Sequence, residues 1–428
     1  MKYLIIISLL TSILSDILNQ ALNIGSASVT YIPIILIFVI HLAKIVKRKS
    51  VENYFWFYAL IYLSILIILI GCFVNGWNTS MMKYIVYYLF MGILVNELQI
   101  SGIKKLFVFI QIVGIVLSVE VIITGMISVN SGIRLIGLRD YLWMNKQYYN
   151  VLYNLVLPIV FWHFFKNKKA IDLVVIVLHL AAAIFFLQIK TLLLSVTIGI
   201  LLVCWILKPV SRKKFLSITT IAVFLVAILV TQFSNYIPDQ IKVVSGYILG
   251  QEQDLDPDSL VYVDTLIVRE EIINNAYNTF KDNYLLGIGY GNYADIVYGM
   301  YVKSIARNNL NYNLPLATEN GILTFLLEGG IIASFIQLLI YAYILFKLIK
   351  AKSRNSLILI SYTILFSFLV SNFVQDNLNY VYWFSLALGA YLTKYLNNSS
   401  IDSEEVNTPY RLLKGLMRKE SKYENFSV

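Results

Sequence analysis

The sequence predicts an all-α polytopic membrane protein with about 12 transmembrane helices and one large extracytoplasmic loop that itself contains helices. Hydrophobic residues occupy 59% of the 428 positions and charged residues only 14%, whereas a soluble globular chain is about half apolar and about a quarter charged. Apolar runs long enough to cross a bilayer recur along the chain. Backbone amides in hydrocarbon need partners within the protein, and barrel-type alternation is not found, so these runs are predicted to be helices.

The individual spans follow from apolar windows of about 19 residues. They lie at 3–19, 29–46, 54–74, 81–97, 105–127, 148–165, 170–188, 190–207, 215–232, 319–346, 356–373 and 378–396. The first run could pass for a signal peptide, but Asp16 interrupts it and no small-residue cleavage site follows, so a retained span is expected. The predicted regions are membrane helices at 1–232, an extracytoplasmic loop at 233–318, membrane helices at 319–396 and a cytoplasmic tail at 397–428.

The charge distribution predicts the orientation of these spans. With a cytoplasmic N-terminus, most of the 34 Lys and Arg residues fall in segments on the cytoplasmic side, as the positive-inside rule requires. Both termini are therefore predicted to be cytoplasmic. The net charge of +10 is explained by orientation and by attraction to anionic membrane lipid, so no nucleic-acid partner is expected.

Basic residues on the external side are exceptions to this asymmetry and call for an explanation. They are Lys83, Arg134, Arg139, Lys146, Lys190, Lys242, Arg269, Lys281, Lys303 and Arg307. Lys190 follows a turn so short that its ammonium must sit at the outer boundary between two spans, where an ionisable group is a functional hypothesis. A lysine that snorkels from a helix end is the alternative. Arg269 lies beside Glu270 and Glu271 in a predicted amphipathic helix, so surface pairing would also explain it.

The segment KDNYLLGIGYGNY at 281–293 has regularly spaced glycines at Gly287, Gly289 and Gly291. This spacing suggests a phosphate cradle or, alternatively, a turn in which backbones pack closely. No strand–turn–helix unit is predicted around it, which excludes a dinucleotide-binding fold.

Carboxylates near the membrane are candidates for a catalytic base. Glu319 and Asn320 lie at the outer mouth of the tenth predicted span, and Glu328 lies about two turns deeper. For Glu328, which precedes two glycines, a helix-packing hydrogen bond is the preferred interpretation. Glu120, inside the fifth span, fits either role.

The histidines and the external aromatic residues are the side chains that could bind a metal or stack on sugars. His41, His163 and His179 fall on three different spans, so they form no metal-ligand cluster in sequence, and no metal is expected. External aromatic residues could stack on sugars, although an interfacial aromatic belt also explains most of them. They are Tyr141, Trp143, Tyr148, Tyr149, Tyr284, Tyr290, Tyr293, Tyr298 and Tyr301.

Four segments, in order along the chain, carry a family resemblance. They are RLIGLRDYLWMNKQYYNVLYNLVLPI at 134–159, IKTLLLSVTIGILL at 189–202, Arg269 with YLLGIGYGNY at 284–293, and ATENGILTFLLEGG at 317–330. Together they resemble the O-antigen ligase and polysaccharide polymerase superfamily of membrane glycosyltransferases, in which a long external loop follows the ninth or a nearby span. Two positions depart from the family pattern: Lys190 stands where Arg is usual and Glu319 where His is common.

The resemblance implies a donor glycan linked to polyprenyl pyrophosphate, a leaving group that needs charge stabilisation more than an acid. Lys190 and Arg269 are expected to bind the pyrophosphate, assisted by Arg134 or Arg139, while Glu319 accepts the proton of the attacking sugar hydroxyl. The expected substrate-binding residues further include Asn320, Tyr290 and Lys281. The resemblance implies neither a metal nor another cofactor.

The partners expected from the resemblance are a polyprenyl-pyrophosphate-linked oligosaccharide and membrane lipid, with a chain-length regulator and a flippase as further candidates, in a bacterial cytoplasmic membrane. A polymerase is preferred to a ligase because the chain is rich in Ile, Asn, Lys and Tyr, which hints at a low-GC source without lipopolysaccharide. A flippase or another transporter is the non-enzyme alternative. It should carry charges deep along a cavity, whereas here they gather at the outer mouth.

Overall fold

The computed structural model describes residues 2–14, 17–18, 26–46, 55–76, 79–130, 142–144, 146–187, 190–209, 211, 219–220, 274–293, 321–349, 355–374 and 380–396. Every regular element in these residues is a helix, which confirms the predicted all-α class.

The helices follow the predicted spans closely. They are α1 (Lys2–Ile13), α3 (Ser26–Val46), α4 (Phe55–Asn75), α5 (Thr79–Glu97), α6 (Ile100–Asn130), α7 (Lys146–Asn167), α8 (Ala170–Ala181), η2 (Ala182–Phe186), α9 (Lys190–Leu207), α14 (Gly321–Ile349), α15 (Ser356–Val374), α16 (Tyr380–Leu392) and η3 (Thr393–Tyr395). A further helix occupies residues 274–282. The predicted span at 215–232 and most of the predicted loop at 233–318 lie outside the described residues.

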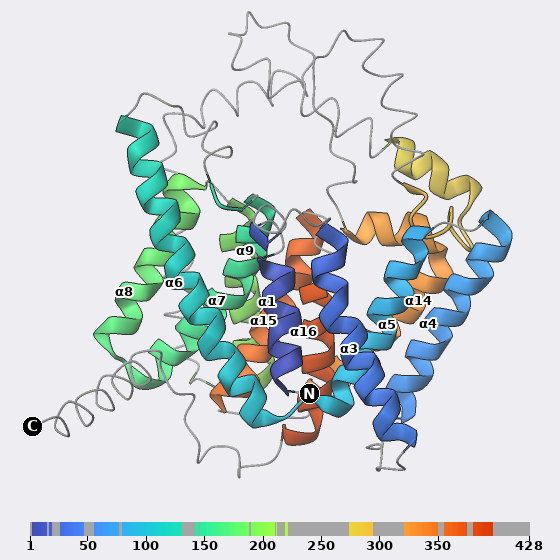
Figure 1. Cartoon of the computed structure of the whole chain (residues 1–428), viewed down its shortest axis with the longest axis horizontal. Helices are drawn as coiled ribbons and strands as arrows, with labels where there is room; N and C mark the ends of the chain where they lie inside the picture. Colours follow the sequence, from blue (N-terminus) through green and yellow to red (C-terminus); the bar gives the residue numbers. More distant parts are fainter. Residues whose placement is uncertain are drawn as a thin grey trace, which may run out of the picture.

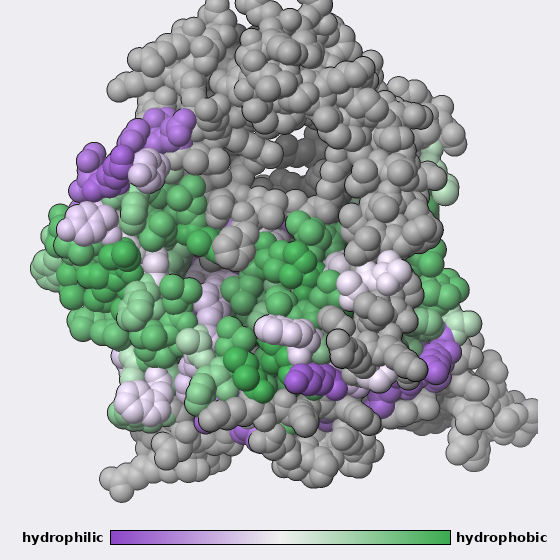
Figure 2. Space-filling model, turned by 180° about the vertical axis from the view of Figure 1, so that it is seen from behind, coloured by the Kyte–Doolittle hydropathy of each residue, from purple (hydrophilic) through white to green (hydrophobic). Residues whose placement is uncertain are grey.

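The surface of the helical bundle is that of a multi-pass membrane protein. Three of the described helices are long and apolar enough to cross a bilayer: Phe55–Asn75, Ile100–Ser128 and Gly321–Ile349. Large apolar side chains point outward along them, including Phe73, which is 94% exposed. On the face shown in Figure 2, hydrophobic residues form a broad band, and the most hydrophilic of the coloured residues lie above and below it. This distribution matches lipid around the band and water at its margins.

The centre of the bundle is formed by α7, α15 and α16, whose side chains are buried almost all round. α9 packs on α15 at Gly199, where a β-carbon would lie 2.5 Å from Ser367 Oγ. α7 is joined to α15 by a hydrogen bond from Trp162 Nε1 to Thr363 Oγ1 of 2.7 Å. α4, α5 and α14 stand side by side next to this centre (Figure 1).

α4 ends and α14 begins at the same end of the bundle, and the segment 274–293 also lies there (yellow in Figure 1). The sequence predicts this end to be external, so we refer to it as the outer end. α1 begins at the opposite, inner end, where α5 ends and α6 begins.

Candidate functional site

α14 is broken near its start. Gly330 has φ 66° and ψ −172°, which is not a helical conformation, and it divides α14 into two parts at 321–329 and 331–349. Each helix end at such a break exposes backbone groups that lack a partner within the helix. In a membrane-embedded helix these groups need partners elsewhere in the protein.

The external segment at 284–289 supplies those partners through its own backbone. The amides of Ile288 and Gly289 donate to the carbonyls of Leu327 and Glu328 at 2.9 and 3.0 Å. In the opposite direction, the amides of Ile331 and Ile332 donate to the carbonyls of Tyr284 and Leu285 at 2.8 and 3.4 Å. Residues 284–292 therefore bridge both sides of the break, and we call this segment the clasp.

Backbone conformation explains the three glycines of the clasp, and the close approach to α14 is a further reason for Gly287. Gly287, Gly289 and Gly291 have φ values of 68°, 87° and 84°, which residues other than glycine rarely adopt. A β-carbon on Gly287 would meet the carbonyl oxygens of Leu327 and Glu328, and one on Gly330 would meet that of Leu285. Of the two interpretations that the spacing allowed, close backbone packing is the one observed. The amides of Ile288 and Gly289 are engaged by α14 and are not available to cradle a phosphate.

A side chain from α4 also holds the clasp. Asn75 is the last residue of α4, and its Nδ2 donates to the carbonyl of Gly287 at 3.1 Å. Gly76, with φ 86°, ends the helix directly after it, in the manner of a C-terminal glycine cap. The clasp therefore connects α4 and α14 at the outer end of the bundle.

Tyr290 lies beneath the clasp and is only 2% exposed. Its ring packs against Tyr84 and Phe325, with centroid distances of 4.6 and 5.6 Å, and its hydroxyl lies against Gly329. Burial raises the pKa of the Tyr290 phenol well above its usual value, and Tyr88 and Glu328 raise it further, so the phenol stays protonated. Protein covers the ring, and sugar stacking would require this packing to open.

Lys281 differs from Tyr290 because it is exposed on the helix at 274–282. Its Nζ lies 4.4 Å from the ring centroid of Tyr277 on the same helix. An ammonium placed over an aromatic face in this way is held without losing its access to solvent. Lys281 is therefore free to meet a ligand at the outer end, and its substrate-binding role stays a prediction.

Buried polar side chains lie on both sides of the break, on the face of α14 that packs against the other helices. Glu328, 4% exposed, lies in the last turn before the break. Further along α14, Gln337 accepts a hydrogen bond from Tyr88 of α5 at 2.9 Å and donates to Tyr382 of α16 at 3.2 Å. These bonds join three helices within the core, as expected for buried polar side chains that are paired.

A second polar cluster at the outer end fixes the start of α7. Glu120 of α6 is buried, and its carboxylate accepts the amide of Trp143 at 3.1 Å and the hydroxyl of Tyr149 at 2.5 Å. Trp143 belongs to the short segment that leads into α7. The structure thus gives Glu120 a positioning role, which the sequence had left open.

Other buried polar side chains join α7 to α9. Asn154 of α7 accepts a hydrogen bond from Ser195 Oγ at 2.8 Å, and Ser195 lies between one and two turns below Lys190, the first residue of α9. η2, a π-helical turn that ends at Phe186, comes shortly before this start. The backbone position of Lys190 at the outer end of α9 is therefore braced by buried side chains.

The histidines each have a different partner in the described structure. His179 Nδ1 is 2.7 Å from Ser118 Oγ, His163 Nδ1 is 2.8 Å from Asp172, and His41 Nδ1 is 3.0 Å from Glu97. They lie on α8, α7 and α3, and these contacts tie neighbouring helices together.

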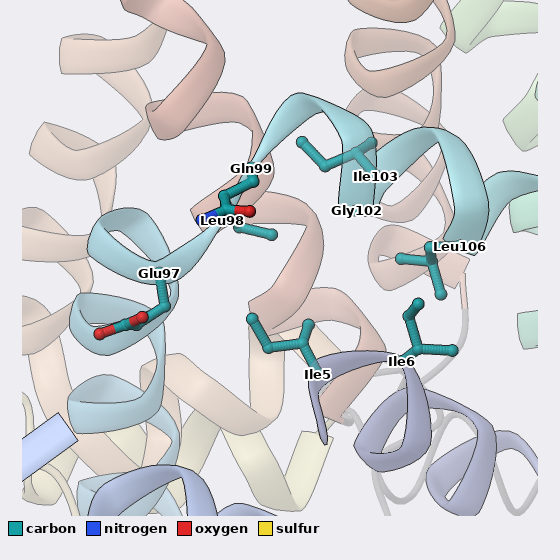
Figure 3. A pocket seen from close by; sticks show the side chains of 8 residues that line it. All are labelled: Ile5, Ile6, Glu97, Leu98, Gln99, Gly102, Ile103 and Leu106. Carbon is teal, nitrogen blue, oxygen red and sulfur yellow. The ribbon is translucent and has the colours of Figure 1, made fainter. Parts of the chain in front are cut away.

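A small pocket lies at the inner end, between α1 and the turn from α5 to α6 (Figure 3). It is lined by Ile5, Ile6, Glu97, Leu98, Gln99, Gly102, Ile103 and Leu106. The Glu97 carboxylate points away from Ile5 and Ile6, so the lining is mostly apolar. This pocket is at the opposite end of the bundle from the clasp and contains none of the predicted site residues.

Most of the predicted site residues, catalytic and substrate-binding, lie outside the described residues. These are Arg134, Arg139, Arg269, Glu319 and Asn320. Lys190 is described by its backbone, at the first position of α9, while Lys281 and Tyr290 lie in the docked segment at 274–293. Asn75 and Glu120 are further candidates. No sequence signal marks Asn75, because an asparagine at a helix end has the ordinary capping explanation.

These features define a multi-pass, all-helical membrane protein in which an external segment docks onto a broken helix at the predicted outer end. Residues 173–338 match the family model described as O-antigen ligase. The matched region runs from α8 into α14 and includes both the clasp and the break, and the match confirms the resemblance seen in the sequence. It indicates membrane glycan processing of the O-antigen ligase or polymerase type. A search of curated proteins gives no match.

Proposed function

We propose that the protein is a polysaccharide repeat-unit polymerase that transfers a glycan from a polyprenyl pyrophosphate donor to a lipid-linked acceptor at the outer face of the membrane. The observation that carries the proposal is the docking of the clasp on the break of α14. Two segments that resemble motifs of the superfamily, 284–293 and 317–330, meet there through two backbone hydrogen bonds, and two more join the first segment to Ile331 and Ile332, directly after the second. Arg269 shortly precedes the helix at 274–282, and Glu319 shortly precedes α14.

In the proposed reaction, a hydroxyl of the acceptor sugar attacks the anomeric carbon of the donor. The new glycosidic C–O bond forms, the C–O bond to the pyrophosphate breaks, and polyprenyl pyrophosphate leaves with the electron pair. Glu319 accepts the proton of the attacking hydroxyl. Lys190 and Arg269 stabilise the charge on the leaving group, assisted by Arg134 or Arg139. These residues require no metal for this chemistry.

Asn320 and Lys281 are the proposed substrate contacts, whereas Tyr290, also predicted from the sequence, is covered by protein beneath the clasp. Of these, Lys281 is accessible in the structure and can interact with an anionic or hydroxyl-rich ligand at the outer end. A ligase would use the same charged groups but would transfer a finished glycan to a different acceptor. A strain lacking the protein should accumulate single lipid-linked repeats if it is the polymerase, and full-length lipid-linked chains if it is the ligase.

The break of α14 also bears on the transporter alternative. In transporters with discontinuous helices, the free helix ends bind substrate or coupling ions. Here, amides and carbonyls on both sides of the break are bonded to the backbone of the clasp. An ion or substrate at this break would have to displace those bonds, which favours an enzyme over a transporter of that kind.

The decisive experiment is reconstitution of the purified protein with lipid-linked repeat units confined to the leaflet that faces the external loop. Polymer should form without any transport step. Lys190→Ala and Arg269→Ala should each lose about 2 to 4 kcal/mol of transition-state stabilisation, or about 30- to 1,000-fold in rate. Lys83→Ala is the matched control, because Lys83 is an exposed lysine near the outer end of α5.

If the wild-type protein makes no polymer from outward-facing repeats, the polymerase proposal is wrong. If Lys190→Ala and Arg269→Ala both keep normal polymer length and amount, the assignment of the pyrophosphate-binding residues is wrong, whatever the reaction is.

A further inference from the structure

Asn75 lies where α4, the clasp and α14 meet. It ends α4, its side chain bonds to the carbonyl of Gly287 in the clasp, and the clasp bonds to both sides of the break in α14. α4 and α14 also pack along each other (Figure 1). The Asn75 side chain thus makes a hydrogen bond that joins α4 to the clasp.

The position of this bond within the clasp makes it effective. Gly287 donates its amide to the carbonyl of Asn283 at 2.8 Å and gives its own carbonyl to Asn75. The next two amides, of Ile288 and Gly289, are those that bind the carbonyls of α14. Asn75 therefore holds the peptide unit directly before the contact with α14, and loss of its bond leaves the Gly287 carbonyl without this partner.

We propose that Asn75 is a positioning residue for glycan transfer, which acts by holding the clasp on the break of α14. The proposal rests on the proposed function. In the sequence, Glu319 and Asn320 directly precede the helix part at 321–329, and Arg269 shortly precedes the helix at 274–282. The clasp thus links the chain segments that carry the proposed base and one of the proposed pyrophosphate-binding groups. A displacement of about 1 Å in such groups is enough to reduce a reaction rate strongly.

The kinetic test compares Asn75→Asp with Asn75→Ala and with Asn283→Ala. Aspartate has the shape of asparagine but no amide hydrogen to donate to the Gly287 carbonyl. Both Asn75 variants should lower kcat about tenfold, with less than about a threefold change in KM for the lipid-linked donor. Asn283→Ala is the matched control, because the Asn283 side chain donates at 3.1 Å to the carbonyl of Thr279 in the helix at 274–282. A kcat of Asn75→Asp equal to that of Asn283→Ala overturns the proposal.

A second measurement does not depend on activity. Hydrogen exchange at the amides of Ile288, Gly289, Ile331 and Ile332 reports directly on the clasp. Asn75→Asp should accelerate exchange at these amides about tenfold or more and leave the amides of α15 unchanged. Unchanged exchange at the clasp overturns the proposed link. If the wild-type protein makes no polymer, the proposed function fails, while this exchange result still decides whether Asn75 holds the clasp.

A cross-link distinguishes a fixed positioning device from a gate. Leu285 and Ile331 are each 50% exposed and lie next to the two reciprocal hydrogen bonds of the clasp. In a protein with Cys72 and Cys204 replaced by Ala, Leu285→Cys and Ile331→Cys can be joined by a short bis-maleimide. A fixed device predicts activity within about twofold of the uncross-linked protein. If the cross-linked protein loses activity while the same cysteine variant without the linker stays active, the clasp must open during the reaction. The proposal would then be wrong.

Discussion

The break of α14 and the cluster around Glu120 are both at the outer end, but different atoms hold them. At the break, the bonds to the clasp are made by backbone amides and carbonyls, and glycines allow the chains to approach. Around Glu120, side chains of α6 and α7 make the bonds and a carboxylate is the common acceptor. The break is therefore sensitive to added atoms, and the Glu120 cluster is sensitive to the removal of atoms.

The largest effect is expected at Gly330. Its φ and ψ values of 66° and −172° lie in a region that is essentially restricted to glycine. Gly330→Ala adds this strain to a collision with the Leu285 carbonyl, so we expect a loss of about 3 kcal/mol or more in stability. Thermal unfolding of the detergent-purified protein measures it.

Gly71→Ala is the control for this substitution, since a β-carbon at Gly71 in α4 meets no atom within 4 Å. Equal unfolding temperatures for the two variants would show that the break does not depend on glycine.

The next effect is expected at Glu120. Glu120→Ala leaves the amide of Trp143 and the hydroxyl of Tyr149 without their acceptor, which should cost about 1 to 3 kcal/mol for each group that stays buried. Glu120→Gln retains a carbonyl oxygen and should cost clearly less. Denaturant unfolding in detergent measures both. If the alanine and glutamine variants are equally stable, the carboxylate is not what holds the start of α7.

A smaller effect is expected where side chains join α5, α14 and α16. Tyr88→Phe removes one hydrogen bond to Gln337 and should cost about 1 kcal/mol. Tyr382→Phe removes the other bond of the same amide. Because both bonds share Gln337, the double variant should deviate from additivity by about 0.5 kcal/mol or more. Strict additivity in unfolding measurements would show that the two bonds are independent.

The smallest effect on stability is expected at Lys281, which is exposed and contacts only Tyr277 among the described aromatic rings. Lys281→Ala should leave the unfolding temperature unchanged and should raise KM for the lipid-linked substrate if the ammonium binds it. Lys83→Ala again serves as the control, since Lys83 lies 5.8 Å from the Tyr87 ring in a comparable contact. An unchanged KM for Lys281→Ala would remove this residue from the proposed site.

Hydropathy predicted the helices well because lipid imposes one strong rule on the sequence. α9 was predicted at 190–207 and observed at Lys190–Leu207, and α3 begins only three residues before its predicted start at 29. α6 extends from Ile100 to Asn130, beyond the predicted 105–127. Its polar and small residues at either end lower the apolar average although they continue the helix.

The site was harder to predict because hydropathy does not indicate which distant segments of the chain contact each other. The pair Gly329–Gly330 lies in an apolar run, which predicts a continuous helix, and the carbonyls that cap the break come from residues 284 and 285, far away in sequence. Tyr290 was assigned to sugar binding from its position in the predicted loop, whereas its burial depends on the fold of the clasp. The convergence of Lys190, Arg269 and Glu319 stays a prediction.

Because backbone atoms make the contact between the clasp and α14, this contact should leave little trace as correlated substitutions among related sequences. Statistical methods that infer contacts from correlated substitutions need side chains that change together. Amide and carbonyl groups are the same at almost every position, so residues such as Leu285 and Ile288 could drift independently of Leu327 and Ile331 while their hydrogen bonds persist. Related sequences would then show two separate invariant glycine positions, 287 and 330, with no covariance to reveal that they are neighbours.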